Sequence, residues 1–303
     1  MLRALVPAFL LAVVCLSASF FDSSQSQDVR IETVPVNGHV SMLVAQGAGN
    51  IGVSVGEDGV LLVDDQFAPF APRIREALAA LSDKEIRFLI NTHHHFDHTG
   101  GNESFGKAGA TIVAHDNVRA RLSTTQVLKA FNREFPPSPK DALPVITFAD
   151  SMTLHFNGDE IRVIHVAPAH TDGDSVIHFV AADVVHTGDL FFNGMGYPFF
   201  DTSSGGSLDG MIAAADKVLS IVGENTRIIP GHGPLSNAED LREFREMMAT
   251  VSARVHELVR AGKGRDEVIA TKPTKDLDAL WAKGMIKPDD WIGFVYDGIV
   301  GAQ

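Results

Sequence analysis

The hydrophobic and polar positions of the chain fall into two successive blocks, each of which mixes strand and helix patterns. In the first block, short apolar runs bounded by glycine, asparagine or aspartate predict β-strands. These strands cover residues 40–44, 51–55, 60–64, 86–91 and 110–114. Apolar residues at helical spacing predict helices over residues 72–81 and 117–122.

The second block repeats this mixture. Strands are predicted over residues 145–148, 153–156, 160–166, 176–181, 184–187 and 227–229, and helices over residues 208–222 and 238–261. Ser207 is the expected N-cap of the first of these helices, and Ser236 or Asn237 introduces the second.

Two segments lie outside this regular pattern. Residues 131–144 contain Phe135 and four prolines, so an irregular excursion is predicted there, either a functional lid or an ordinary surface loop. From Gly264 onward, short helical pieces are predicted. Their aromatic residues are expected to pack the C-terminal tail onto the body of the protein: Trp281, Trp291 and Tyr296.

The order of these elements predicts an α/β (α+β) protein. Two mixed sheets packed face to face, with helices outside, would bury the apolar side of every element. No glycine- or proline-rich linker divides the chain. We therefore expect one domain over residues 28–265 and a helical tail over residues 266–303 that packs on it.

The N-terminus has the layout of a secretory signal peptide over residues 1–21. A short cationic start is followed by an apolar run, small residues and then a polar stretch. The run is too short to span a bilayer comfortably, so no stable membrane span is expected after cleavage. Cys15 is the only cysteine, which leaves the mature chain without a disulfide or a thiolate ligand. We predict a periplasmic or secreted protein.

Composition narrows the classes of partner. The chain of 303 residues has a formal net charge of −13 and no cluster of basic residues. Nucleic acid is therefore excluded as a partner, because binding its backbone requires cationic neutralisation. A small-molecule substrate is expected.

A histidine-rich stretch over residues 92–102 carries the candidate chemistry. It follows a predicted strand and leads into a glycine-containing turn. Residues two apart in an extended segment project to the same side, so His93 and His95 can converge on one cation. Asp97 and His98 lie just beyond, where the chain turns, and can reach a second cation. Imidazole and carboxylate donors suit zinc, and also iron or manganese.

Three further candidate ligands each follow a predicted strand and are flanked by glycine or small residues: His170, Asp189 and His232. Loops at strand ends are where a rigid scaffold can direct side chains inward, and glycine permits close approach of the backbone. Each motif alone is a weak signal. In this order, together with the histidine-rich stretch, they predict a single metal centre.

This ordered set resembles the metallo-β-lactamase superfamily of di-metal hydrolases, over a region from about residue 40 to residue 232. The resemblance implies a four-layer αβ/βα sandwich with two metals, usually Zn²⁺, at one edge between the sheets. It implies a first metal on His93, His95 and His170, and a second metal on Asp97, His98 and His232. Asp189 would bridge both metals.

The resemblance also implies roles for residues outside the metal coordination. Asp97 would orient the nucleophilic water and transfer its proton. Asp64 matches a carboxylate that orients a ligand histidine, although Asp65 is adjacent. Asn193 and Tyr197 are candidates for substrate contact, because they lie in the glycine-containing loop after Asp189.

The leading hypothesis is a zinc-dependent hydrolase of a small-molecule ester, thioester, lactone or amide. The ligand pattern with His98 and a bridging Asp189 is similar to glyoxalase II and lactonase relatives. Export favours a periplasmic β-lactamase as the first alternative. An iron-dependent sulfur dioxygenase-type enzyme on the same fold is the second alternative.

Overall fold

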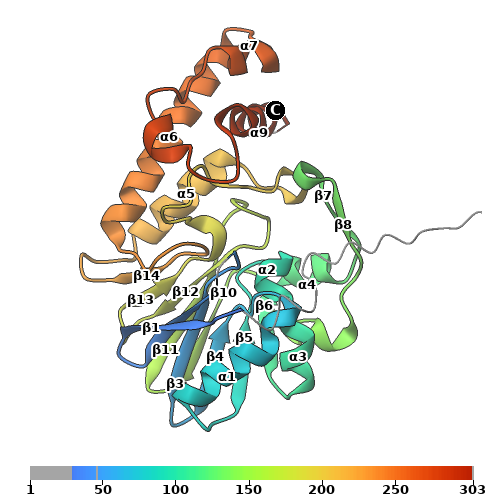
Figure 1. The fold of residues 1–303 in the computed structure, drawn as a ribbon, viewed down its shortest axis with the longest axis vertical. Helices are drawn as coiled ribbons and strands as arrows, with labels where there is room; N and C mark the ends of the chain where they lie inside the picture. The colour runs from blue at the N-terminus through green and yellow to red at the C-terminus, as the bar shows by residue number, and fades with distance from the viewer. Residues whose placement is uncertain (1–28, 46, 302–303) are drawn as a thin grey trace, which may run out of the picture.

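The structure is a computed structural model that describes residues 29–45 and 47–301. The predicted signal peptide lies outside the described residues. Two β-sheets pack against each other and carry helices on their outer faces (Figure 1). The predicted αβ/βα sandwich is thereby confirmed.

The larger sheet is mixed. Its strands, in spatial order, are β1 (Glu32–Asn37), β2 (Val40–Val44), β3 (Ile51–Gly56), β4 (Gly59–Val63), β5 (Ile86–Ile90), β6 (Thr111–His115) and β9 (Ile146–Phe148). Neighbouring strands run antiparallel from β1 to β4 and parallel from β4 to β9. The smaller sheet contains, in spatial order, β10 (Ser151–Phe156), β11 (Asp159–His165), β12 (Ser175–Phe179), β13 (Val184–His186) and β14 (Arg227–Ile229).

Side-chain alternation along the strands creates the layers. In β4, Leu61 and Val63 pack between the two sheets, while Val60 and Leu62 face the outer helices of the larger sheet. Those helices include α1 (Ala71–Leu81) and α3 (Asn102–Lys107). Between them in sequence lies the one-turn helix α2 (Phe96–Thr99), and α4 (Asp116–Leu122) follows β6.

The outer face of the smaller sheet is covered by the C-terminal helices. These are α5 (Leu208–Leu219), α6 (Ala238–Arg260), α7 (Arg265–Ala270), α8 (Asp278–Trp281) and α9 (Pro288–Gly301). Ser207 and Asn237 cap α5 and α6 with their side chains, as predicted. Trp291 of α9 is fully buried and donates its indole N–H to the Pro198 carbonyl oxygen, which attaches the tail to the body.

Three elements differ from the sequence predictions. Strand β1 was not expected at all. The excursion over residues 131–144 is not wholly irregular, because it contains β8 (Arg133–Phe135), which pairs with β7 (Gln126–Leu128) in a two-stranded hairpin. The hairpin stands between α4 and the C-terminal helices (Figure 1). Finally, the tail ends in the 14-residue helix α9 rather than in short pieces only.

Within the described part of the chain, no helix is both long and apolar enough to cross a membrane.

Candidate metal centre

All seven predicted ligands lie just beyond the end of a strand: His93, His95, Asp97 and His98 after β5, His170 after β11, Asp189 after β13 and His232 after β14. Strands β4 and β5 are parallel, as are β13 and β14, so the carboxyl ends within each pair meet at one edge. The structure brings these side chains together at that edge, between the two sheets.

The first group of donors consists of His93, His95, His170 and Asp189, whose ligand atoms lie within 4.8 Å of one another. All four side chains are buried. The His95 Nδ1 atom is 2.9 Å from His170 Nε2, and Asp189 Oδ2 is 3.4 Å from the same His170 nitrogen.

The second group consists of Asp97, His98 and His232, with ligand atoms again within 4.8 Å of one another. His98 Nε2 is 3.2 Å from His232 Nε2, and Asp97 Oδ2 is 3.3 Å from the same His232 nitrogen. Asp189 joins the two groups. Its Oδ1 atom lies 3.0 Å from His98 Nε2, while its Oδ2 atom faces the first group.

Four ligand histidines each have one ring nitrogen that faces the other donors and one that faces a residue outside the two donor groups. The hydrogen bond made by the outer nitrogen determines which nitrogen carries the proton. His98 Nδ1 donates to Asp64 Oδ2 over 2.8 Å, and His170 Nδ1 donates to the Phe199 carbonyl oxygen over 2.9 Å. A histidine that binds a metal is neutral and carries one proton, so Nε2 of each residue would present its lone pair to a cation. These lone pairs face other nitrogens and carboxylate oxygens.

The same argument applies to the other two histidines of the first group. Thr92 donates its hydroxyl proton to Asp64, so its oxygen accepts from His93 Nδ1 at 3.0 Å. His95 Nε2 faces Asp201 Oδ2 at 3.4 Å, which leaves Nδ1 for the interior of the cluster. His93 Nε2 and Asp189 Oδ1 are buried without a hydrogen-bond partner.

Buried acceptors that face one another without a donor between them cost free energy unless a cation lies among them. Three imidazole nitrogens with one carboxylate oxygen, next to a second imidazole and carboxylate set, suit divalent transition metals. The residues present therefore fit a pair of divalent cations.

Asp64 is held where it can orient His98. It follows β4 with a left-handed backbone (φ 63°), a conformation that is uncommon outside glycine and is retained where the surrounding structure enforces it. Its Oδ1 atom accepts the Thr92 backbone N–H over 2.7 Å. Asp65 does not contact a ligand in this way, because its Oδ1 atom accepts from the Gly101 backbone.

Asp201 was not singled out by the sequence analysis. It is buried and follows an aromatic run, and its carboxylate accepts hydrogen bonds from Ser203 and from the Ser204 hydroxyl. These contacts hold Oδ2 toward His95 Nε2. No ligand-like spacing connects Asp201 to the other motifs, so only its position as N-cap of the turn η6 (Thr202–Ser204) was available as a signal.

Glycines permit the backbone to approach the cluster. A Cβ atom at Gly49 would lie 2.4 Å from His98 Cε1, and one at Gly231 would lie 2.1 Å from Asp189 Oδ1. Both distances are far below van der Waals contact, so these two positions require glycine.

The carboxylates dominate the electrostatics of the second group. Burial alone lowers the pKa of His232, but Asp189 and Asp97 outweigh this effect and raise that pKa to about 9. Burial raises the pKa of Asp97, but His98 and His232 outweigh it and bring that pKa to about 2. In the first group, burial lowers the pKa of His170 to about 4, against the opposing effect of Asp189. Burial also raises the pKa of Asp189, but His98 and His232 outweigh it and hold that pKa well below its usual range. Asp97 and Asp189 are thus both ionised at neutral pH and available to cations.

The two candidate substrate contacts have other partners. Tyr197 is buried, stacks on Trp291 with ring centroids 4.4 Å apart, and donates its hydroxyl to Asp278 over 2.8 Å. It holds the C-terminal helices rather than facing the cluster. Asn193 donates its side-chain amide to the Pro234 carbonyl oxygen and its backbone N–H to His232, so it braces the loop that carries His232.

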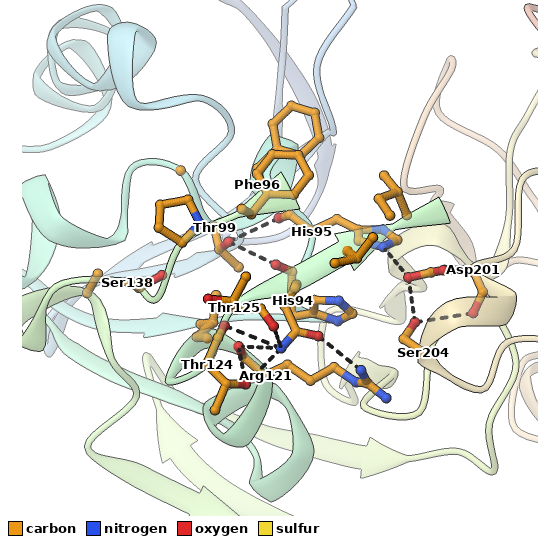
Figure 2. Close-up of a pocket in the computed structure, with 18 of the residues that line it drawn as sticks. His94, His95, Phe96, Thr99, Arg121, Thr124, Thr125, Ser138, Asp201 and Ser204 are labelled. Atoms are coloured by element: carbon orange, nitrogen blue, oxygen red, sulfur yellow. Dashed lines mark hydrogen bonds and ion pairs between the residues drawn. The ribbon is translucent and has the colours of Figure 1, made fainter. Parts of the chain in front are cut away.

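A cavity of about 530 Å³ lies beside the first group, beneath the β7–β8 hairpin. Figure 2 shows His94 within it, between Arg121 and His95, with Asp201 and Ser204 next to His95. His94 forms a third group of donors with His95 and Asp201, whose ligand atoms lie within 4.8 Å of one another, and its buried Nδ1 atom has no hydrogen-bond partner.

Comparisons with known proteins agree with this geometry. A family model described as the metallo-beta-lactamase superfamily matches residues 44–235. A hydroxyacylglutathione hydrolase of Pelagibacter ubique (strain HTCC1062) is 28% identical over 156 residues, which cover 50% of this chain and 54% of that protein. The chain spans about half the length of the curated relatives it matches.

Solved structures show the same fold. A metallo-beta-lactamase from Pontibacter korlensis has a TM-score of 0.59 at 17% identity, covering 73% of this chain and 99% of that one. The stereoselective inverting sec-alkylsulfatase Pisa1 from Pseudomonas sp. has a TM-score of 0.67 at 18% identity, covering 90% of this chain and 51% of that one.

Proposed function

The chain belongs to the metallo-β-lactamase superfamily, and on this premise we propose that it is a zinc-dependent hydrolase of a small-molecule ester, thioester, lactone or amide. The observation that carries the proposal is the position of Asp189. One of its carboxylate oxygens faces His170 in the first donor group, and the other faces His98 in the second.

In this proposal His93, His95 and His170 hold one cation, Asp97, His98 and His232 hold the other, and Asp189 contacts both. Two such cations, when bound, supply a water whose pKa is lowered to about 7 and an electrophile for a carbonyl oxygen. Zinc is the proposed cation because neutral imidazole and carboxylate suit it, and iron or manganese fits the same donors.

The exposure of the ligand side chains indicates from which side a substrate reaches the centre. The Asp97 side chain is 20% exposed and that of His232 is 14% exposed, whereas the side chain of Asp189 is only 5% exposed. The second group therefore provides the side of the centre that a substrate can reach. Asp97, ionised at neutral pH, is placed to accept a proton from the nucleophile and return it to the leaving group.

The class of bond rests on similarity. The relatives named hydroxyacylglutathione hydrolase support hydrolysis of an acyl bond. The N-terminal sequence pattern, which indicates export, supports the alternative of a β-lactamase. A panel containing an acyl thioester, a homoserine lactone, simple aryl esters and a chromogenic cephalosporin separates these reactions when it is run with zinc-loaded protein. Iron as the bound metal without hydrolysis of any substrate would contradict the hydrolase proposal.

Replacement of Asp97 tests the mechanism. Asp97→Asn should lower kcat at least about 100-fold on whichever substrate the protein hydrolyses, because general base catalysis contributes about that factor. Asp150→Asn is the matched control, because Asp150 is exposed and lies outside both donor groups. Equal activity of the two variants would remove Asp97 from the mechanism.

A further inference from the structure

The Thr92 side chain lies between one ligand of each donor group. Its hydroxyl donates to Asp64 Oδ2 over 2.7 Å and lies 3.0 Å from His93 Nδ1. The same Asp64 oxygen accepts from His98 Nδ1 over 2.8 Å. These contacts form one chain of hydrogen bonds, which joins His93 of the first group to His98 of the second on the side that faces away from the other donors.

The acceptor at the middle of this chain determines the direction of each hydrogen bond. An ionised carboxylate only accepts, so Asp64 takes the proton of the Thr92 hydroxyl and the Nδ1 proton of His98. The hydroxyl has a single proton, so its oxygen can only accept from His93. The ring proton of His93 therefore lies on Nδ1. Its Nε2 atom, which is buried without a hydrogen-bond partner, keeps a lone pair for a cation.

The surrounding backbone holds Thr92 in this position. Its N–H donates to Asp64 Oδ1 over 2.7 Å, and its carbonyl oxygen accepts from the N–H of Ser175, the first residue of β12 in the smaller sheet, over 2.9 Å. A Cβ atom at Gly188 would lie 2.6 Å from the Thr92 hydroxyl oxygen, so the backbone there closes over the side chain. Thr92 is only 1% exposed. Its hydroxyl is therefore held between Asp64 and His93.

Without this hydroxyl, the ring proton of His93 would have a different acceptor. His93 Nε2 lies 3.9 Å from Asp189 Oδ2. A buried N–H without an acceptor costs free energy, so a proton on Nδ1 would no longer be favoured. The tautomer with the proton on Nε2, facing the Asp189 carboxylate, would be preferred instead. That proton would occupy the position of the first cation.

We propose that Thr92 is a positioning residue for both cations of the centre, because its hydroxyl sets the tautomer of His93 directly and holds Asp64 against His98. The inference rests on the two-cation centre of the proposed function and is independent of the bond that is hydrolysed. Asp64 contacts a ligand of the second group and Asp201 a ligand of the first, whereas the Thr92 hydroxyl acts on both groups.

Thr92→Val tests the role of the hydroxyl, because valine has nearly the same shape and leaves no room for a water in its place. Cadmium-loaded protein gives one NMR signal per bound ion, and the chemical shift separates the ion with three imidazole ligands from the ion with two. In competition with a chelator, Thr92→Val should bind the first ion at least about tenfold more weakly and the second at least about fivefold more weakly. Thr92→Ser keeps the hydroxyl and should restore both affinities. A loss at one site only, or at neither, overturns the inference.

Thr226→Val is the matched control. Thr226 is also 1% exposed, and its hydroxyl also donates to an aspartate, Asp183, over 2.6 Å. It accepts the Gly223 backbone N–H over 2.8 Å and belongs to neither donor group. Thr226→Val should retain the wild-type affinity for both ions although it loses a buried hydroxyl. Equal losses in Thr226→Val and Thr92→Val would assign the effect to stability and overturn the inference.

The tautomer of His93 provides a test that needs neither metal nor activity. In metal-free protein at about pH 8, above the usual imidazole pKa of about 6.5, long-range proton–nitrogen NMR distinguishes the two tautomers. The wild-type protein and Thr92→Ser should carry the ring proton on Nδ1, and Thr92→Val should carry it on Nε2. This change in a protein that does not bind two cations would uphold the role of Thr92 in setting the tautomer and reject the proposed function. Two bound cations in the wild-type protein, with the Nδ1 tautomer kept in Thr92→Val, would overturn the role of Thr92 alone.

Discussion

Asp64 Oδ2 accepts the Nδ1 proton of His98 over 2.8 Å, and this contact sets the tautomer of the histidine that lies nearest to the bridging carboxylate. Asp64 is fully buried and also accepts two hydrogen bonds from Thr92. The orientation of His98 is therefore determined by the end of β4, a segment 34 residues earlier in the chain.

Asp64→Asn should weaken binding of the second metal about 10- to 100-fold. The new amide N–H₂ would donate to His98 Nδ1 and so favour the tautomer that carries its proton on Nε2. That proton would occupy the position where the metal binds. Asp65→Asn is the matched control, because Asp65 is equally buried but accepts from the Gly101 backbone. Competition with a chromophoric chelator measures both affinities. Equal affinities in the two variants would refute the role of Asp64.

Asp201→Asn should instead weaken the first metal, because Asp201 faces His95. We expect a loss of about tenfold, at the lower end for such a contact, since the His95–Asp201 distance is 3.4 Å. Cobalt-substituted protein reports the change as altered absorption of one of two metal equivalents. If Asp201→Asn leaves both equivalents unchanged, the contact with His95 has no function in metal binding.

Gly49→Ala should displace His98, because the added methyl group would lie 2.6 Å from its Nε2 atom. We expect a destabilisation of about 1–3 kcal/mol in chemical denaturation, typical of overpacking, together with loss of one metal equivalent. Gly223→Ala is the control, since its methyl group meets only Thr226 Oγ1 at 3.8 Å. Two bound equivalents in Gly49→Ala would show that the loop moves aside instead.

His186 predicts a specific pH dependence of stability. Burial lowers its pKa to about 4, and both ring nitrogens have partners in the neutral form: Nε2 with the Asn50 carbonyl oxygen and Nδ1 with the Gly188 N–H. The folded-state pKa lies below the unfolded value of about 6.5. The stability contribution is therefore complete above pH 6.5 and is lost as the pH falls toward 4.

Between pH 7 and pH 5 this group should lower the free energy of unfolding by about 2 kcal/mol. His186→Gln keeps a donor and an acceptor but does not titrate. Between pH 7 and pH 5, the free energy of unfolding of this variant should therefore fall by about 2 kcal/mol less than that of the wild-type protein. Both proteins are measured by urea denaturation in the presence of a chelator, which removes the contribution of metal release. Parallel pH profiles would show that His186 is not buried in its neutral form.

Local sequence signals were sufficient for most of the strands. The runs before and after the turn at residues 57–59 are paired as β3 and β4, because alternation and turn residues act over a few positions. Strand β1 was missed because Pro35 interrupts its six residues, and because it is an edge strand that pairs with β2 alone among the described strands. The β7–β8 hairpin was missed because its short strands are stabilised by contacts with distant elements, such as Phe96 with Phe135.

The metal-ligand positions could be predicted from the sequence for a different reason. Each is a metal-binding residue type placed at a strand end, and the parallel strands bring those ends together. The contacts of Asp201 and Tyr197 could not be predicted from the sequence in this way. The function of Asp201 depends on a contact with His95 across 106 residues, and the position of Tyr197 depends on the docking of α8 and α9. Neither contact leaves a local pattern in the sequence.

The most direct test of the metal centre is a crystal structure of the zinc-loaded protein with anomalous data collected above and below the zinc edge, together with the zinc content in solution. Two zinc ions per chain are expected, one among His93, His95 and His170 and one among Asp97, His98 and His232, with Asp189 between them. A single ion, or ions bound away from these seven side chains, would contradict the account.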